Sequence, residues 1–162
     1  MLEAEVGKLL ISQGLTLTAA ESCTGGLVSH RLTNVPGCSS YFLGSIVSYA
    51  NEAKCGVLGV SLATLQAHGA VSPQTAEEMA GGARRLFGAD IALAVTGVAG
   101  PGGGTVEKPV GLVFLHLSTD DCEWGERRQW AGGRQENKAQ SAEAMLLMLQ
   151  RYLTSRSPAC AG

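Results

Sequence analysis

The sequence is poor in charge, in aromatic residues and in histidine. Charged residues make up 16% of its 162 residues, aromatic residues make up 5%, and there are 3 histidines. The formal net charge is −2, so no positive field favours binding to nucleic acid. No apolar run approaches the roughly 18 residues that a membrane-spanning helix needs. These absences predict a soluble protein with neither a nucleic-acid partner nor a membrane span.

The cysteines lack the pattern of a disulfide framework or a zinc site. There are 5, an odd number, and no two of them have the spacing C-x-x-C. No cluster of His, Asp or Glu has the spacing of metal ligands. Residues 1–14 (MLEAEVGKLLISQG) carry acidic side chains and a helical periodicity, unlike a signal peptide. We therefore expect a reducing, cytoplasmic compartment, no metal and no organic cofactor.

The apolar content is high enough for one hydrophobic core. Hydrophobic residues make up 45% of the chain, and its length fits a single domain over residues 1–162, with 154–162 expected as a flexible tail. Periodicity predicts helices over 2–13, 27–33, 52–58, 73–87 and 136–153, and strands over 15–20, 41–49, 91–97, 110–118 and 123–130. The alternation predicts an α/β fold: a three-layer α/β/α sandwich with a mixed, mostly parallel sheet. The short connection at 119–122 predicts an antiparallel hairpin.

Two polar residues are expected to cap helices. Ser72 precedes Pro73, which suits the first position of a helix, and Asn51 precedes a short helical segment.

The first candidate for chemistry is the hexapeptide 21–26 (ESCTGG), which lies between a predicted strand and a predicted helix. Ligands bind at strand ends in open α/β sheets, and the first turn of a helix offers unpaired N–H groups. Ser22 at this turn is a candidate nucleophile, and the amides of Thr24, Gly25 and Gly26 suit an oxyanion hole. Taken alone, the hexapeptide favours the alternative that Ser22 or Thr24 caps the helix.

A serine nucleophile needs a base, and the three histidines suit structural or surface positions better than a catalytic triad. Lys54 is the other candidate. With Asn51 as cap it falls in the first turn of its helix, where the helix dipole opposes a further positive charge. Burial would lower the pKa of Lys54 towards the neutral amine that a base requires. The alternative is a solvated surface lysine, and Tyr49 either relays a proton or packs.

Residues 97–105 (GVAGPGGGT) form a glycine-rich loop after the most apolar predicted strand. The loop lacks the G-K-[ST] of a phosphate-binding P-loop, but its backbone and the neighbouring hydroxyls suit a phosphate or an oxyanion. Arg134 could fork onto a phosphate from elsewhere in the chain. The candidate binding residues are Thr96, Gly97, Gly102, Gly103, Gly104, Thr105 and Arg134.

Six motifs occur in an order that resembles one family. They are AESCTGG (20–26), SYANEAK (48–54), HGAVS (68–72), AVTGVAGPGGGT (94–105), EKPVG (107–111) and GRQENK (133–138). Together they resemble the CinA C-terminal domain family, whose stand-alone members include nicotinamide-nucleotide amidases. The resemblance covers about residues 3–153.

The resemblance implies deamidation of nicotinamide mononucleotide to nicotinic acid mononucleotide and ammonia, within pyridine-nucleotide recycling, by a Ser/Lys hydrolase without a cofactor. It places the nucleophile on Ser22, the lysine on Lys54 and the neighbouring tyrosine on Tyr49. It also implies a homo-oligomer, and we expect exposed Val and Leu of the hairpin and the last helix to form the interface.

The sequence departs from the family in two respects. Members usually carry Asp before the arginine that corresponds to Arg134, where this chain has Gly133. Larger members also bear an N-terminal molybdopterin-binding-like domain with pyrophosphatase activity, which this sequence does not imply. Two alternatives stay open: an amidase for another small amide, and a nucleotide-binding or regulatory domain without turnover.

Overall fold

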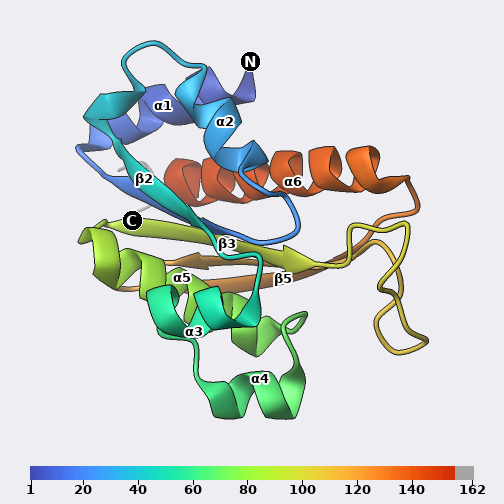
Figure 1. Cartoon of the computed structure of the whole chain (residues 1–162). Coiled ribbons are helices and arrows are strands. Elements are labelled where there is room, and N and C mark those ends of the chain that lie inside the picture. Colours follow the sequence, from blue (N-terminus) through green and yellow to red (C-terminus); the bar gives the residue numbers. More distant parts are fainter. Residues whose placement is uncertain (156–162) are drawn as a thin grey trace.

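The computed structural model describes residues 1–155 and contains a five-stranded sheet with helices on both faces (Figure 1). The strand order is β2-β1-β3-β4-β5. β1 pairs in parallel with β2 and β3, whereas β4 runs antiparallel to β3 and β5. The predicted three-layer α/β/α sandwich with a mixed sheet and a terminal hairpin is therefore confirmed. The strands are β1 (Leu17–Glu21), β2 (Phe42–Val47), β3 (Ile91–Gly97), β4 (Leu112–Ser118) and β5 (Glu123–Gln129).

One face of the sheet is covered by α1 (Leu2–Gln13), α2 (Leu27–Thr33) and α6 (Arg134–Ser155). The larger core lies here, where leucines of β1, β3 and β4 meet leucines and methionines of α6. The apolar periodicity of α1 and α6 turns one stripe of each helix towards the sheet.

The other face is covered by α5 (Pro73–Phe87), with α3 (Asn51–Leu58) and α4 (Leu62–His68) packed outside it. The sheet presents small side chains to α5, namely Ala20, Ala92 and Ala94, so the helix lies close to the strands. The predicted cap of α5 is confirmed, because the Ser72 hydroxyl accepts a hydrogen bond from the Thr75 amide at 3.1 Å.

Three predictions about the elements need correction. Asn51 is the first residue of α3 rather than its cap, a position that Ala50 takes without a side-chain hydrogen bond. α6 extends to Ser155, so 154 and 155 are helical, while 156–162 lie outside the described residues. α4 and a short 3₁₀ turn at Cys38–Ser40 were not predicted.

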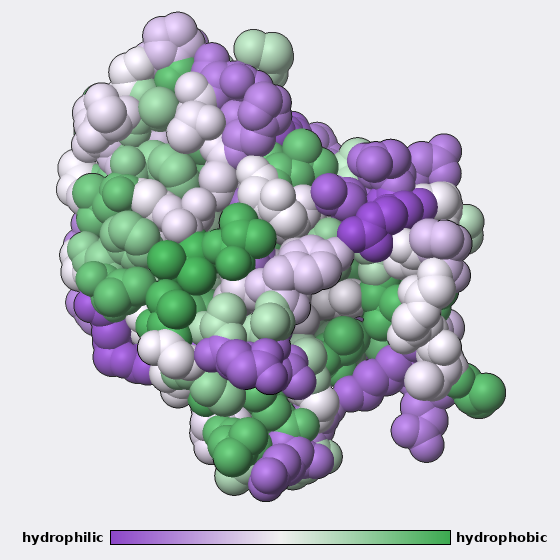
Figure 2. All heavy atoms as spheres, viewed as in Figure 1, coloured by the Kyte–Doolittle hydropathy of each residue, from purple (hydrophilic) through white to green (hydrophobic). Residues whose placement is uncertain are grey.

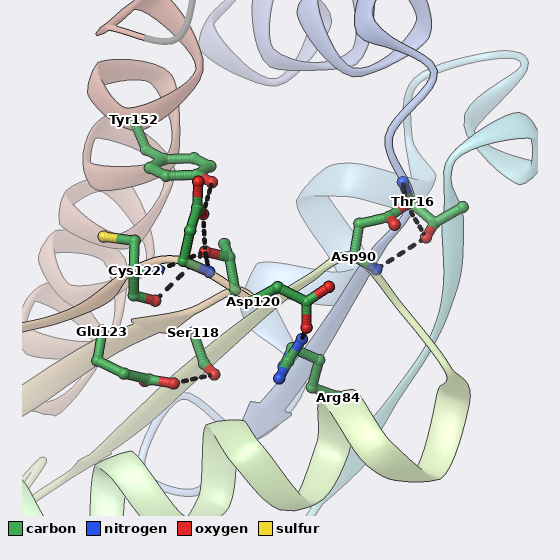
Figure 3. Close-up of polar contacts among 10 residues, drawn as sticks. Thr16, Arg84, Asp90, Ser118, Asp120, Cys122, Glu123 and Tyr152 are labelled. Atoms are coloured by element: carbon green, nitrogen blue, oxygen red, sulfur yellow. Dashed lines mark hydrogen bonds and ion pairs between the residues drawn. The ribbon is translucent and has the colours of Figure 1, made fainter.

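Polar contacts join the segments at the end of the sheet where β1 and β3 begin (Figure 3). The amide and hydroxyl of Thr16, just before β1, donate to Asp90 Oδ2 at 2.8 and 2.6 Å, just before β3. Arg84 of α5 pairs with Asp120 of the β4–β5 turn. Structural contacts therefore hold this end of the sheet, and the candidate residues Ser22, Tyr49 and Thr96 lie at the opposite end, where β1, β2 and β3 end.

The exposed apolar side chains are not where the sequence predicted an interface. The Val and Leu residues of β4 and α6 are buried or half-buried, because both elements pack into the main core. Hydrophobic side chains gather instead around the edge strand β2, where Leu43 and Val47 are exposed (Figure 2). No helix among residues 1–155 is long and apolar enough to cross a membrane.

Candidate active site

Three hydroxyl side chains lie side by side at the ends of β2, β1 and β3. The parallel ladder continues one residue past the strands, because the Ser48 amide donates to Glu21 O at 2.8 Å and the Ser22 amide donates to Val95 O at 2.9 Å. Ser48 is therefore the neighbour of Ser22 on one side, and Thr96 is its neighbour on the other.

These three side chains share one face of the sheet. Side chains two residues apart along a strand point to the same face. The residues two positions earlier are Ile46, Ala20 and Ala94, and all three pack into the core under α5. The hydroxyls therefore face the layer that contains α3 and α5.

Lys54 reaches this row from α3. Its Nζ lies 3.0 Å from Ser22 Oγ and donates to the Ser48 carbonyl oxygen at 2.7 Å. Lys54 is 1% exposed, and Ser22 is 9% exposed. Burial lowers the pKa of Lys54, and the charge of Cys23 acts in the opposite direction. A buried amine beside a serine hydroxyl is an arrangement that can take the hydroxyl proton.

Cys23, next to Ser22, is a poor competing nucleophile. Its side chain is buried, and burial raises the pKa of the thiol to about 12, against the opposing effects of Lys54 and of the amides of Cys23 and Thr24. The thiolate is the reactive form of cysteine, so this thiol is inert near neutral pH.

Glu21 caps α2, a role that the sequence analysis missed. The carboxylate is fully buried. Its Oε2 accepts from the Thr24 hydroxyl at 2.6 Å and from the amides of Gly26 and Val28 at 3.0 and 3.1 Å. Its Oε1 accepts from the amide and the hydroxyl of Ser29 at 2.8 and 2.6 Å. The alternative that Ser22 or Thr24 caps the helix is therefore wrong, and Ser22 Oγ is available to Lys54.

This cap also changes the predicted oxyanion hole. The Gly26 amide donates to Glu21, and the Gly25 amide donates to Ser22 O at 3.1 Å. Both glycines have positive φ, 61° at Gly25 and 96° at Gly26, which explains their place in the turn. Among residues 1–155, the amides of Cys23 and Thr24 donate to no oxygen. The turn therefore offers these two amides rather than those of the glycines.

Arg134, the first residue of α6, joins the glycine-rich loop to Tyr49. It donates to Gly100 O at 2.8 Å and to the Tyr49 hydroxyl at 2.6 Å. Tyr49 is 57% exposed, and within the described part of the chain its hydroxyl has no hydrogen bond to Ser22 or Lys54. In the structure the Tyr49 hydroxyl contacts Arg134, and the role of Tyr49 as a proton relay stays a prediction.

The start of the glycine-rich loop is fixed, and its tip is exposed. The Thr96 hydroxyl donates to Ala70 O at 2.7 Å, and Asn137 Nδ2 donates to Ala99 O at 3.0 Å. Residues 101–107 are exposed and extend beyond the end of the sheet (Figure 1). This places Gly102, Gly103, Gly104 and Thr105 in the exposed tip, whereas Gly97 belongs to β3.

Asn137 and Lys138, both on α6, were missed by the sequence analysis. Asn137 is buried and also accepts from the Gly132 amide at 3.1 Å, so it ties the loop to the start of the helix. The Nζ of Lys138 lies close to the turn at residues 22–26, which we call the serine turn. A Cβ placed on Gly25 would be 3.6 Å from this nitrogen. Their position in the GRQENK motif was the available signal. Within residues 1–155, no group of three or more His, Cys, Asp or Glu is placed to hold a metal ion.

The chain matches a known family along almost its whole length. The model of the CinA C-terminal domain matches residues 1–153. A CinA-like protein of Desulfotalea psychrophila is 49% identical over 148 residues, which cover 91% of this chain and 36% of that protein. A CinA-like protein of Desulfosudis oleivorans is 59% identical over 120 residues, which cover 74% of this chain and 29% of that protein. The chain thus spans about a third of the length of these curated relatives.

Solved structures share the fold. The crystal structure of a competence-damaged protein (CinA) superfamily protein from Klebsiella pneumoniae has a TM-score of 0.91 at 35% identity, covering 94% of this chain and 96% of that one. The competence/damage inducible protein CihA from Agrobacterium tumefaciens has a TM-score of 0.88 at 40% identity, covering 95% and 96%. With the family model matching nearly its whole length, this chain belongs to the CinA C-terminal domain family.

Proposed function

We propose that this chain is a cytoplasmic, homo-oligomeric amidohydrolase that deamidates nicotinamide mononucleotide to nicotinic acid mononucleotide and ammonia. The observation that carries the proposal is the contact of 3.0 Å between Lys54 Nζ and Ser22 Oγ in a buried site. The substrate comes from the motif resemblance described above, since the names of the relatives specify none.

The first half of the reaction forms an acyl-enzyme. Neutral Lys54 takes the proton of Ser22 Oγ, which attacks the carboxamide carbon and forms a tetrahedral oxyanion. The amides of Cys23 and Thr24 are the donors proposed for this oxyanion. When the C–N bond breaks, Lys54 gives its proton to the leaving nitrogen, which departs as ammonia.

The second half regenerates the enzyme. Lys54, neutral again, takes a proton from water as the water oxygen attacks the acyl carbon. The bond between this carbon and Ser22 Oγ then breaks, and Lys54 returns the proton to Ser22. The sum is hydrolysis of one amide bond by one water molecule.

The nucleotide phosphate is proposed to bind near the start of α6. Arg134 and Lys138 bring two positive charges to its first two turns, beside the glycine-rich loop and the serine turn. A helix N-terminus disfavours cations but binds anions, so a bound phosphate would be stabilised by both the helix and the two side chains.

The test is ammonia release from nicotinamide mononucleotide by the wild type, Ser22→Ala and Lys54→Met. Lys54→Met keeps the length of the stem and removes the amine, and Lys8→Met, an exposed lysine on α1, is the matched control. We expect both site variants to lose activity by at least about 100-fold, which is typical for an acid–base group, and the control to keep it. Full activity of Ser22→Ala would refute the serine mechanism. Binding of the nucleotide without ammonia release would favour a regulatory domain, and release from other small amides alone would change the substrate.

A further inference from the structure

Ser48 carries a buried hydroxyl that the proposed reaction has not used. Ser48 is 0% exposed, and its Oγ has no hydrogen-bond partner in the part of the chain that the structure describes. Buried polar side chains in native proteins nearly always have a partner, so such a group calls for an explanation.

The other two hydroxyls of the row have partners. Ser22 Oγ contacts Lys54 Nζ, and Thr96 Oγ1 donates to Ala70 O. Ser48 differs from them although it lies in the same register and on the same face. Its own carbonyl oxygen accepts from Lys54 Nζ at 2.7 Å, so its side chain starts beside the amine. A rotation about the Cα–Cβ bond moves Oγ between staggered positions without moving the backbone.

The proposed reaction changes what the Lys54 amine needs. In the neutral amine the Ser48 carbonyl accepts one N–H and the Ser22 hydroxyl meets the lone pair, so the remaining N–H belongs to an uncharged group. The ammonium has three N–H groups and no acceptor site. With Lys54 1% exposed, the third N–H is buried, and an unpaired buried charge is costly.

We propose that Ser48 Oγ accepts the third N–H of the Lys54 ammonium, which makes Ser48 a catalytic residue beside Ser22 and Lys54. This inference rests on the proposed Ser/Lys hydrolysis. No covalent bond to Ser48 forms or breaks: its hydroxyl keeps its own proton, stabilises the ammonium after Ser22 has been deprotonated, and is released when the proton leaves.

The contact between Ser48 Oγ and the ammonium changes the pKa of Lys54 in a defined direction. An acceptor for the ammonium favours the charged form, so its loss lowers the pKa of Lys54 further than burial alone does. The titratable groups on the elements packed here are Cys23 and Glu21 at the end of β1, Glu52 and Cys55 on α3, Glu78 on α5, and Tyr49 with Arg134 beside the glycine-rich loop. Glu21 points to the α2 face, and Glu78 accepts hydrogen bonds from Ser61 and Thr64. Neither carboxylate is therefore a hydrogen-bond partner of the Ser48 hydroxyl.

The experiment compares Ser48→Ala, Ser48→Thr and the control Ser118→Ala. Ser118 is a buried serine at the end of β4, at the opposite end of the sheet from Ser48. Each is labelled at Ser22 with phenylmethanesulfonyl fluoride over a range of pH, with the labelled residue located by mass spectrometry. We expect Ser48→Ala to move the midpoint of labelling to lower pH and to reduce kcat for nicotinamide mononucleotide by about 10-fold, the loss typical of one hydrogen bond to a charged group. Ser48→Thr and Ser118→Ala should keep the wild-type midpoint.

A folded Ser48→Ala variant with an unchanged midpoint and unchanged kcat would overturn the inference. If Ser48→Ala does not fold, Ser48→Cys is used, because a thiol is a weak acceptor: the same shift supports the inference, and an unchanged midpoint overturns it. If the wild type releases no ammonia while the labelling midpoint still shifts in Ser48→Ala, the proposed substrate fails and the role of Ser48 stands. If ammonia release depends on Ser22 and the midpoint does not move, only the role of Ser48 fails.

Discussion

Replacing Glu21 by alanine removes the acceptor of the hydrogen bonds that hold the start of α2. The donors left behind are the amides of Gly26, Val28 and Ser29 and the hydroxyls of Thr24 and Ser29. The hydroxyls can rotate towards other acceptors, whereas the amides cannot. The Val28 amide belongs to a buried residue, and those of Gly26 and Ser29 belong to half-buried ones.

The expected loss follows from this difference. A buried donor without an acceptor costs about 1–3 kcal/mol, and half-buried amides regain part of the loss from water. We therefore expect Glu21→Ala to lower the free energy of unfolding by about 3–5 kcal/mol. For a protein of this size, that corresponds to a fall in Tm of about 10 °C.

The measurement is urea unfolding followed by far-UV circular dichroism. The control is Glu5→Ala, since Glu5 is exposed on α1, and surface changes usually stay within about 0.5 kcal/mol. A loss below about 1 kcal/mol for Glu21→Ala would refute the reasoning that its hydrogen bonds organise the turn.

Further predictions concern the site and its supports. The value of kcat/KM should rise with pH as Lys54 loses its proton, and because burial lowers the pKa of Lys54, the rise should occur below the range of an ordinary lysine; a pH profile measures it. Gly82→Ala should destabilise the protein by about 1–3 kcal/mol, because a Cβ there would lie 1.9 Å from Leu58 O of α3. Gly81→Ala, where the nearest atom is 3.2 Å away on the flexible Arg85 side chain, should be neutral or stabilising, and thermal melts of both variants measure the difference. Arg134→Gln should raise KM for the nucleotide by about 10-fold with a smaller change in kcat, and Arg151→Gln near the other end of α6 should not. Size-exclusion chromatography with light scattering should give a mass above that of a monomer, and Leu43→Glu on β2 should reduce it.

The strands and the long helices were predictable because their signals are local. The nearly continuous apolar run of β3 and the Ser72-Pro73 start of α5 need no tertiary information to be recognised. α4 escaped prediction because its seven residues lack a side-chain cap and a long apolar pattern.

The site was predictable only in part. Ser22 and Lys54 are 32 residues apart, and the motif resemblance paired them, whereas the local pattern favoured a helix cap. The cap is instead Glu21, whose side chain reaches across the turn to amides 5 to 8 residues further along the chain. The contact of Tyr49 with Arg134 was not predictable, because the two residues are 85 apart in the sequence, a distance over which local propensity carries no information.

Glu21 and Ser22 are consecutive residues at the end of β1, and their side chains contact helices on opposite faces of the sheet. Glu21 fixes α2 and Ser22 contacts Lys54 of α3, so a single peptide unit links helices on the two faces of the sheet. We therefore expect a substitution in the first turn of α2 to shift Ser22 through Glu21, without a direct contact to the layer in which Lys54 lies. We expect sequence variation in α2 to be limited by the contact between Ser22 and Lys54 on the other face of the sheet.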